Sequence, residues 1–147
     1  MFASPIGPLR FAASDAGLTR VCFEGEPLPI DEPPVSPLVT QELAEYFAGT
    51  RREFTVLLDL SGVTEFRAAV LRELAKVPFG ETTTYAQLAR AVGNPKAVRA
   101  VGSACATNPL PLFIPCHRVL RSDGYLGGYR GGVEAKRFLL RMEGIDV

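Results

Sequence analysis

A cysteine and the only histidine of the chain are neighbours, Cys116 and His117, in a segment that three prolines interrupt, Pro109, Pro111 and Pro115. A cysteine is a strong nucleophile only as the thiolate, and a neighbouring base is one of the few ways to form a thiolate near neutral pH. The alternative is a buried structural cysteine beside a core histidine, which is the commoner arrangement for either residue alone. Because the sole histidine adjoins a cysteine here, we favour a functional thiol.

The base in this pair needs help from other groups. Side chains of successive residues usually diverge, so we expect a water molecule to carry the proton from Cys116 to His117. A histidine that acts as a base also needs a partner on its other ring nitrogen. Glu143 is the candidate, because a carboxylate at the end of the last predicted helix is electrostatically misplaced unless another interaction holds it. The predicted arrangement is nucleophile, base and orienting carboxylate.

The composition excludes several classes of protein. With 147 residues, of which 47% are hydrophobic and 22% charged, the chain suits one domain or two small ones that share a core. Three cysteines at irregular spacing and a single histidine argue against a disulfide framework and against a structural zinc site. No apolar run approaches the roughly 20 residues that span a membrane, and no secretion signal opens the chain. We therefore expect a protein of the reducing cytoplasm.

The formal net charge of zero hides an asymmetry along the chain. Residues 1–63 carry 4 basic and 9 acidic side chains, a net charge of −5, whereas residues 64–147 carry 12 basic and 7 acidic ones, a net charge of +5. Segregated positive charge suits a polyanionic partner such as nucleic acid. Solvated helix faces would produce the same imbalance, so charge alone does not decide the partner.

The first part of the chain is predicted to form a small antiparallel sheet with one helix against it. Alternating apolar residues over 4–23, with a turn at 14–17, are typical of a β-hairpin. Residues 24–37 predict a surface loop, and residues 54–60 predict a core strand. A helix is predicted over 37–47, with an apolar face of Leu38, Val39, Leu43, Tyr46 and Phe47. No residue here offers chemistry, so we interpret the region as a scaffold.

The second part is predicted to be mainly helical, with helices over 64–76, 84–92, 95–105 and 133–143. A turn that contains Gly93 joins the middle two, which is a helix-turn-helix pattern with basic residues on the open side of its second helix. Many helical hairpins bind no DNA, so the pattern alone does not establish a DNA partner. The predicted N-caps are Thr64 and, with Gln87 as its capping-box partner, Thr84. The side chains predicted to face inward include Phe66, Val70, Leu71, Leu74, Val98, Val101, Phe138, Leu139 and Met142.

Several motifs resemble, in order, those of the O6-alkylguanine-DNA alkyltransferases. The most specific is Pro115-Cys116-His117-Arg118-Val119. Related alkyltransferase-like proteins carry tryptophan at the position of Cys116, so the chain is similar to the branch that repairs. The likeness covers residues 64–147 and is fainter before them. The other matching segments are residues 80–89, 99–102, 107–111, 128–132 and 139–144.

This resemblance implies an α+β fold with two domains. Residues 1–60 would form a ribonuclease H-like scaffold domain, which is a small antiparallel sheet with a helix. Residues 61–147 would form a mainly helical, winged-helix-like domain that binds DNA and accepts the alkyl group.

The implied activity is DNA repair by direct, irreversible transfer of the alkyl group from O6-alkylguanine to Cys116, once per molecule, as a methylated-DNA–protein-cysteine methyltransferase. The resemblance implies neither a cofactor nor a metal ion. The expected partner is double-stranded DNA that contains alkylated guanine, with no membrane partner. A monomer is expected, while cooperative binding on DNA and activity on O4-alkylthymine are left open.

Individual residues receive roles from the same resemblance. Cys116 attacks the alkyl carbon, His117 takes the thiol proton through a water molecule, and Glu143 orients the imidazole. Tyr85 helps the guanine to leave as a neutral species, and Asn108 braces the turn beside the cysteine. The base pocket is expected to be lined by Tyr85, Val119, Tyr129 and Arg130.

DNA binding is assigned to the helix-turn-helix, which in this family enters the minor groove. An enzyme that acts on a base in a duplex must flip it out, and Arg99 would fill the gap that is left. The expected DNA-binding residues are Thr84, Lys96, Ala97 and Arg99. Two features depart from the family: the short N-terminal region lacks the zinc ligands of some relatives, and Arg130 stands where relatives often have a small residue. Its side chain would narrow the pocket or contact a phosphate.

Two other readings of the Cys116–His117 pair compete with alkyl transfer. A cysteine hydrolase or acyltransferase needs an oxyanion hole, and its base normally lies far from the nucleophile in sequence, so the adjacency counts against it. A lesion sensor would keep the fold and bind DNA without transfer, and the presence of the cysteine argues against it. Cys22 and Cys105 are interpreted as packing residues.

Overall fold

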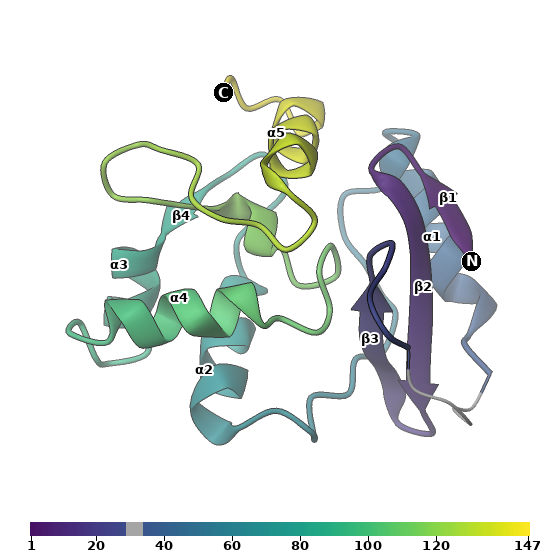
Figure 1. The fold of residues 1–147 in the computed structure, drawn as a ribbon, viewed down its shortest axis with the longest axis horizontal. Coiled ribbons are helices and arrows are strands. Elements are labelled where there is room, and N and C mark those ends of the chain that lie inside the picture. Colours follow the sequence, from purple (N-terminus) through teal and green to yellow (C-terminus); the bar gives the residue numbers. More distant parts are fainter. Residues whose placement is uncertain (29–33) are drawn as a thin grey trace. The chain divides into compact units, whose positions relative to one another are not determined.

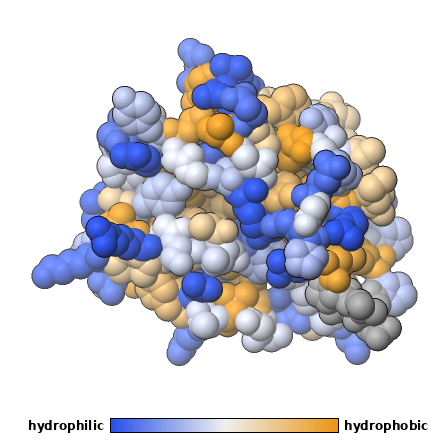
Figure 2. Space-filling model, in the orientation of Figure 1, coloured by the Kyte–Doolittle hydropathy of each residue, from blue (hydrophilic) through white to orange (hydrophobic). Residues whose placement is uncertain are grey.

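The computed structural model describes residues 1–28 and 34–147, and the chain folds as two compact units, Met1–Gly62 and Val63–Val147 (Figure 1). The predicted domain boundary after residue 60 lies two residues before the end of the first unit. Both units combine helices with short strands, so the α+β class is confirmed. No helix among the described residues is long and apolar enough to cross a membrane. Figure 2 shows hydrophilic residues spread over the visible face, with hydrophobic ones between them.

The first unit is built on a three-stranded antiparallel sheet in the order β1 (Phe2–Ser4), β2 (Gly7–Ser14), β3 (Gly17–Cys22). The predicted hairpin is confirmed as β2 and β3, whereas β1 was not predicted. A bulge between Ala12 and Ala13 breaks the expected alternation, so both alanines are buried and Phe11 is only half-buried. Gly17 is required at the turn, because a Cβ there would lie 2.6 Å from the carbonyl oxygen of Leu57.

Helix α1 (Pro37–Phe47) has the predicted bounds, and Figure 1 shows it beside the sheet. The side chain of Ser36 accepts a hydrogen bond from the backbone of Leu38, and Gly49 follows the helix with a positive φ of 82°. The helix buries Val39, Glu42, Leu43 and Tyr46. Leu38 was predicted to face inward, but its position in the first turn leaves it 44% exposed.

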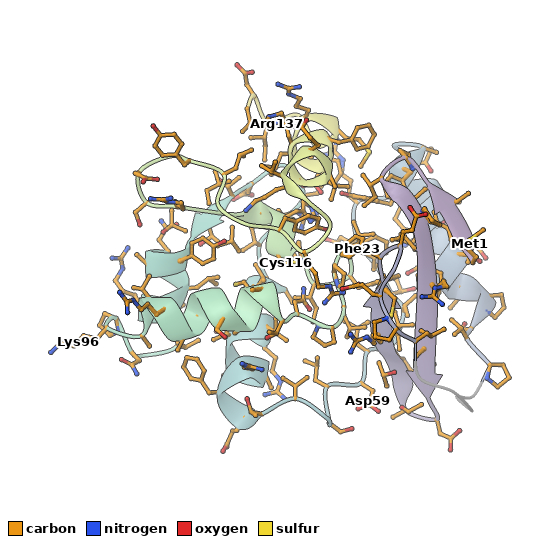
Figure 3. The ribbon with its side chains drawn as sticks, in the orientation of Figure 1. Met1, Phe23, Asp59, Lys96, Cys116 and Arg137 are labelled. Atoms are coloured by element: carbon orange, nitrogen blue, oxygen red, sulfur yellow. The ribbon has the colours of Figure 1, made fainter. Side chains whose placement is uncertain are left out.

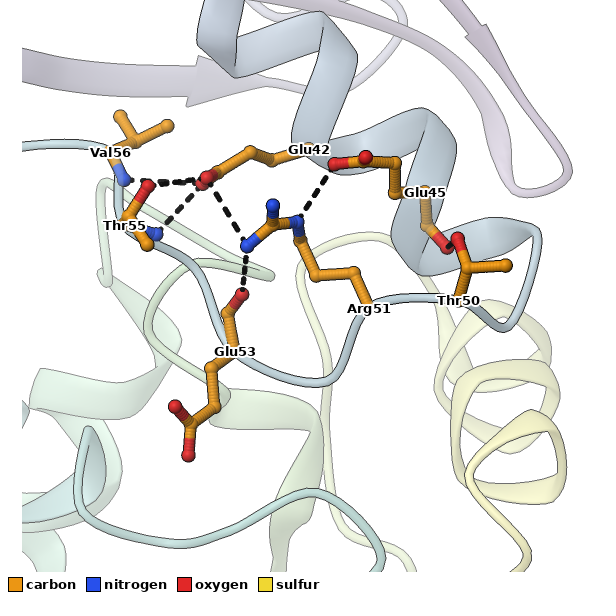
Figure 4. Close-up of polar contacts among 7 residues, drawn as sticks. All are labelled: Glu42, Glu45, Thr50, Arg51, Glu53, Thr55 and Val56. Carbon is orange, nitrogen blue, oxygen red and sulfur yellow. Dashed lines mark hydrogen bonds and ion pairs between the residues drawn. The ribbon is translucent and has the colours of Figure 1, made fainter.

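The predicted core strand at residues 54–60 does not form. Leu58 makes one isolated bridge to Leu18, and the preceding backbone donors bind a side chain instead of a neighbouring strand. The backbone N–H groups of Thr55 and Val56 donate to the buried carboxylate of Glu42 at 2.8 and 3.2 Å (Figure 4). The apolar run predicted a strand here, but the N–H groups of Thr55 and Val56 donate to Glu42 and not to a neighbouring strand. The predicted loop 24–37 lies partly outside the described residues.

Charge compensates the burial of Glu42. Arg51 approaches it at 3.3 Å and also pairs with Glu45 at 2.9 Å (Figure 4). Burial opposes ionisation of Glu42, but the hydrogen bonds from Thr55 and Val56 and the charge of Arg51 outweigh it and lower the pKa of the carboxyl group. The carboxylate therefore ties helix α1 to the segment after it.

The second unit contains α2 (Glu65–Leu74), α3 (Tyr85–Ala91), α4 (Val98–Ala106) and α5 (Val133–Met142). Helix α2 follows Thr64, whose side chain makes no capping hydrogen bond, and it ends two residues earlier than predicted. In α2 and α5, two side chains predicted to face inward are partly exposed, Phe66 at 37% and Phe138 at 41%. In α5 the inward positions belong to Lys136, Leu139 and Leu140.

The predicted helix-turn-helix is present as α3 and α4. Thr84 and Gln87 form the predicted capping box, and Gly93 ends the first helix with a φ of 80°. Helix α4 begins at Val98 rather than at Pro95, because the backbone of residues 94–97 closes a turn first. Val98 is 38% exposed and was wrongly predicted to face inward. A short parallel pair joins β4 (Thr83–Thr84) to β5 (Val119–Leu120).

Between α4 and β5 the chain forms no long helix, as its prolines predicted. A single turn of 3-10 helix, η1 (Cys116–Arg118), carries the Cys-His pair directly into β5. The pairing of β5 with β4 brings this turn to the start of α3. The local fold therefore places the thiol beside the helix-turn-helix.

Candidate active site

A buried carboxylate, Glu143, connects the histidine to the rest of the site. Glu143 is the residue after α5, and its Oε2 lies 2.7 Å from Nε2 of His117. Arg118 donates to both carboxylate oxygens, from Nε at 2.8 Å and from Nη2 at 3.0 Å, and Gly80 donates its backbone N–H at 3.3 Å. His117 and Arg118 reach the same acceptor because they are consecutive in the tight η1 turn.

Arg118 serves the fold around the carboxylate. Its side chain is buried, and besides Glu143 it binds the carbonyl oxygen of Val77 at 2.7 Å. A bidentate arginine keeps a buried carboxylate ionised. Because Arg118 directly follows His117 in the sequence, its contact with the same carboxylate could have been predicted.

The imidazole of His117 is neutral at neutral pH. Burial lowers its pKa, and the charges of Arg118 and Lys136 act in the same direction, while Glu143 opposes them. A carboxylate only accepts hydrogen bonds, so the ring proton belongs on Nε2 and leaves Nδ1 as an acceptor. Nδ1 is buried and has no hydrogen-bond partner among the described residues. That nitrogen can accept a proton from the nucleophile.

Cys116, labelled in Figure 3, is 7% exposed and lines a pocket of about 360 Å³. Burial raises the pKa of the thiol, whereas a hydrogen bond from Asn108 and the positive charges of Arg130 and Lys136 lower it. The resting residue is therefore a thiol that needs a base. Cys105, which was predicted as a packing residue, lines the same pocket with the same exposure, so it is the adjacent His117 that distinguishes Cys116.

Asn108 fixes the backbone before the nucleophile. Its amide donates to the carbonyl oxygen of Ile114 and its side-chain oxygen accepts from the N–H of Leu110, both at 2.9 Å. The carbonyl oxygen of Asn108 in turn accepts a hydrogen bond from the guanidinium of Arg130. The residue is completely enclosed, and it holds the turn that leads to Cys116.

Three of the four residues predicted for a base pocket line the pocket beside Cys116: Tyr85, Tyr129 and Arg130. Val119, whose backbone was predicted to contribute, is not part of this lining, and its carbonyl oxygen accepts a hydrogen bond from Lys136 at 2.6 Å. The rest of the lining, besides Cys116, consists of small residues that the sequence analysis missed, Gly102, Cys105, Ala106 and Gly128. Three of these share one face of α4, so their spacing of three and four residues was the available signal.

Tyr85 and Cys105 keep their protons at neutral pH. Burial raises the pKa of the tyrosine, and it raises the pKa of Cys105 to about 12. Tyr85 can therefore donate a hydrogen bond into the pocket, and Cys105 is held as a thiol. The backbone comes close to the phenol at Gly127, where a Cβ would lie 3.1 Å from the tyrosine oxygen.

The four residues predicted to bind DNA all lie on the helix-turn-helix. Thr84 caps α3, Ala97 precedes α4, and Lys96 and Arg99 are exposed. Neither basic side chain forms an ion pair within the described part of the chain. Figure 3 shows Lys96 at the end of the helix pair that is remote from Cys116. The two cations are thus available to an external anion.

These features define the class of protein. A histidine–glutamate pair lies beside a thiol that lines a pocket, which is typical of a protein with a nucleophilic cysteine. The adjacent helix-turn-helix is typical of a DNA-binding protein.

Comparisons with known proteins agree with this description. Residues 65–145 match the family model "6-O-methylguanine DNA methyltransferase, DNA binding domain", and residues 1–60 match the ribonuclease-like domain of the same proteins. A methylated-DNA–protein-cysteine methyltransferase of Methanosarcina acetivorans is 41% identical, over 98% of this chain and 96% of the relative. The constitutive enzyme of Bacillus subtilis is also 41% identical, over 97% and 93%.

Solved structures show the same likeness. Mycobacterium tuberculosis OGT in complex with DNA has a TM-score of 0.89 and 40% identity, over 97% of this chain and 89% of that one. Schizosaccharomyces pombe Atl1, bound to damaged DNA containing O6-carboxymethylguanine, has a TM-score of 0.52 and 31% identity, over 56% and 78%. The chain belongs to the 6-O-methylguanine DNA methyltransferase family.

Proposed function

We propose that this protein repairs O6-alkylguanine in double-stranded DNA by transferring the alkyl group to Cys116. The thiol proton passes through a water molecule to Nδ1 of His117, and the thiolate attacks the alkyl carbon in line with the C–O bond. An S–C bond forms as the C–O bond breaks, and the electron pair goes to the guanine. The thiol proton ends on the guanine, which leaves as a neutral base. The thioether is permanent, so each molecule reacts once.

The observation that carries this proposal is the 2.7 Å contact between His117 and Glu143 behind a cysteine that opens into a pocket. The lowered pKa of His117 supplies a neutral base, and the raised pKa of Tyr85 keeps a donor for the departing base. A soft sulfur nucleophile suits a saturated carbon, and the reaction as written uses neither a cofactor nor a metal ion. Asn108 serves by holding the turn before the nucleophile.

DNA binding belongs, in this proposal, to the helix-turn-helix. Lys96 and Arg99 supply exposed positive charge, while Thr84 and Ala97 lie at the helix starts, where backbone N–H groups can face a phosphate. The target nucleotide is flipped into the pocket, and Arg99 takes its place in the stack. The partner is duplex DNA that carries the alkylated base.

The remaining assignments complete the proposal. Residues 1–60 act as a scaffold and residues 61–147 as the DNA-binding and alkyl-acceptor domain, in a monomer of the cytoplasm. Tyr129 and Arg130 line the pocket together with residues of α4. Because Arg130 lies in this wall, the range of alkyl groups that are accepted depends on its side chain. Whether O4-alkylthymine is also a substrate is a question for the same assay.

One measurement separates this function from its competitors. The protein is incubated with duplex DNA that contains O6-methylguanine, and its intact mass and the modified peptide are determined. Alkyl transfer predicts one methyl group per molecule, located on Cys116. A hydrolase would turn over without a lasting adduct, and a lesion sensor would bind the duplex with no change in mass; either result would refute the proposal.

A further inference from the structure

Lys136 is a charged residue with no exposed surface. It lies on α5, and its Nζ donates to the carbonyl oxygens of Val119 at 2.6 Å, Leu126 at 2.5 Å and Gly128 at 3.2 Å. An ammonium group has three donors and no acceptor, so these three carbonyls satisfy it completely in its charged form. Among the described residues, no carboxylate lies close enough to Lys136 to form an ion pair with it. Such burial of an unpaired cation is costly and calls for an explanation.

The three carbonyls belong to two different segments of the site. Val119 directly follows the η1 turn that carries Cys116, whereas Leu126 and Gly128 belong to the glycine-rich segment that forms another part of the pocket. One ammonium group therefore joins the backbone of the nucleophile to the backbone of the pocket wall. Without it, the buried carbonyl group of Val119 and the partly buried carbonyl groups of Leu126 and Gly128 would lose this donor.

The electrostatic surroundings of Lys136 point to the thiol. Burial lowers the pKa of Lys136 to about 8, and the neighbouring Cys116 and Cys105 are the groups that oppose this shift. In return Lys136 lowers the pKa of Cys116, together with Arg130, and it lowers the pKa of His117. The cation thus disfavours a charged imidazole and favours a charged sulfur.

We propose that Lys136 is a positioning residue for alkyl transfer, whose ammonium group holds the two segments of the pocket together and stabilises the thiolate of Cys116. It does not serve as the base, because all three of its N–H donors are directed at carbonyl oxygens. The inference rests on the proposed function, in which Cys116 is the alkyl acceptor.

The test measures the thiol rather than repair. Cys116 is labelled with iodoacetamide over a range of pH, and labelling at this site is followed by peptide mass spectrometry. Lys136→Gln keeps amide donors but removes the charge, so it should raise the midpoint pH by about one unit or more. Lys136→Arg keeps the charge and should stay near the wild-type midpoint. Lys76→Gln, at a lysine side chain that is 71% exposed, is the matched control.

Folding of each variant is checked by circular dichroism before labelling. An unchanged midpoint in folded Lys136→Gln would overturn the proposal, and so would an equal rise in Lys136→Arg. Failure of wild-type protein to accept a methyl group from DNA, with the midpoint shift intact, would refute the proposed function and leave the coupling between Lys136 and Cys116 standing.

A measurement on the wild-type protein covers the case in which the variants do not fold. The pKa of Lys136 is followed by NMR of labelled lysine before and after Cys116 is blocked with iodoacetamide. Because coupling between two titrating groups is reciprocal, blocking the thiol should lower the pKa of Lys136. An identical pKa in both samples would show that the two groups do not interact, which would overturn the proposal.

Discussion

Replacing Glu143 with glutamine tests the part of the site on which the mechanism depends. The carboxylate accepts hydrogen bonds from His117, Arg118 and Gly80. An amide of the same shape keeps one oxygen but turns an NH₂ group toward one of its former donors. The variant Glu143→Gln therefore leaves Arg118 without a countercharge and removes the group that fixes the imidazole proton on Nε2.

Both consequences have a magnitude that follows from burial. Removing one partner of a buried ion pair costs about 3–5 kcal/mol of stability, which is a large share of the roughly 5–15 kcal/mol of a typical domain. The reaction should slow by about 10³–10⁴-fold, the order of loss seen when the carboxylate of a catalytic triad becomes an amide and the histidine takes the wrong tautomer. The loss in rate should persist in the fraction that remains folded.

Single-turnover transfer from O6-methylguanine duplex, followed by rapid quenching, measures the rate, and urea unfolding measures the stability. Glu134→Gln is the matched control, because Glu134 lies on the same helix with its side chain 83% exposed and should change neither quantity appreciably. Transfer at the wild-type rate by folded Glu143→Gln would refute the assignment of Glu143 as the group that orients His117. If Glu143→Gln lost stability but kept its transfer rate, Glu143 would have a structural role only.

Three further changes probe other parts of the molecule. Cys116→Ser should abolish transfer yet keep duplex binding in a mobility-shift assay, and detectable methylation of this variant would refute the nucleophile. Arg99→Ala should slow repair in duplex DNA by on the order of 10-fold or more while sparing reaction with the free modified base, because unstacking costs a few kcal/mol; equal losses would count against base flipping. Glu42→Gln should cost about 1–3 kcal/mol in urea unfolding. Since the pKa of Glu42 is lowered on folding, its stabilisation is present above the usual value of 4.5 and is lost as pH falls through the folded value, so the variant should lack this pH dependence.

Local signals in the sequence predicted much of the fold. Helix α1 has the expected bounds because Ser36 and Pro37 begin it and Gly49 follows it, and the capping box of α3 depends on two residues three positions apart. The pairing of His117 with Glu143 was also accessible, because a carboxylate at a helix C-terminus needs a partner. In each case the information lies within a few residues or in one electrostatic anomaly.

The errors arise where distant groups compete for the backbone. The apolar run at residues 54–60 predicted a strand, but the N–H groups of Thr55 and Val56 bind Glu42, which the helical pattern of α1 gave no reason to bury. Lys136 looks like an ordinary helix-surface lysine in the sequence. Its burial depends on carbonyls that lie 17, 10 and 8 residues away, and no periodicity encodes them.

The charges of the site explain why the thiol can be both enclosed and reactive. Arg118 and Glu143 neutralise each other, and burial favours the uncharged forms of Cys116 and His117. Lys136, with a pKa of about 8, still carries its proton at neutral pH. When the thiol proton leaves Cys116, the negatively charged sulfur becomes a countercharge for Lys136, which has no carboxylate partner among the described residues. Burial therefore raises the pKa of Cys116, while the charges of Lys136 and Arg130 partly offset this at the sulfur atom that attacks.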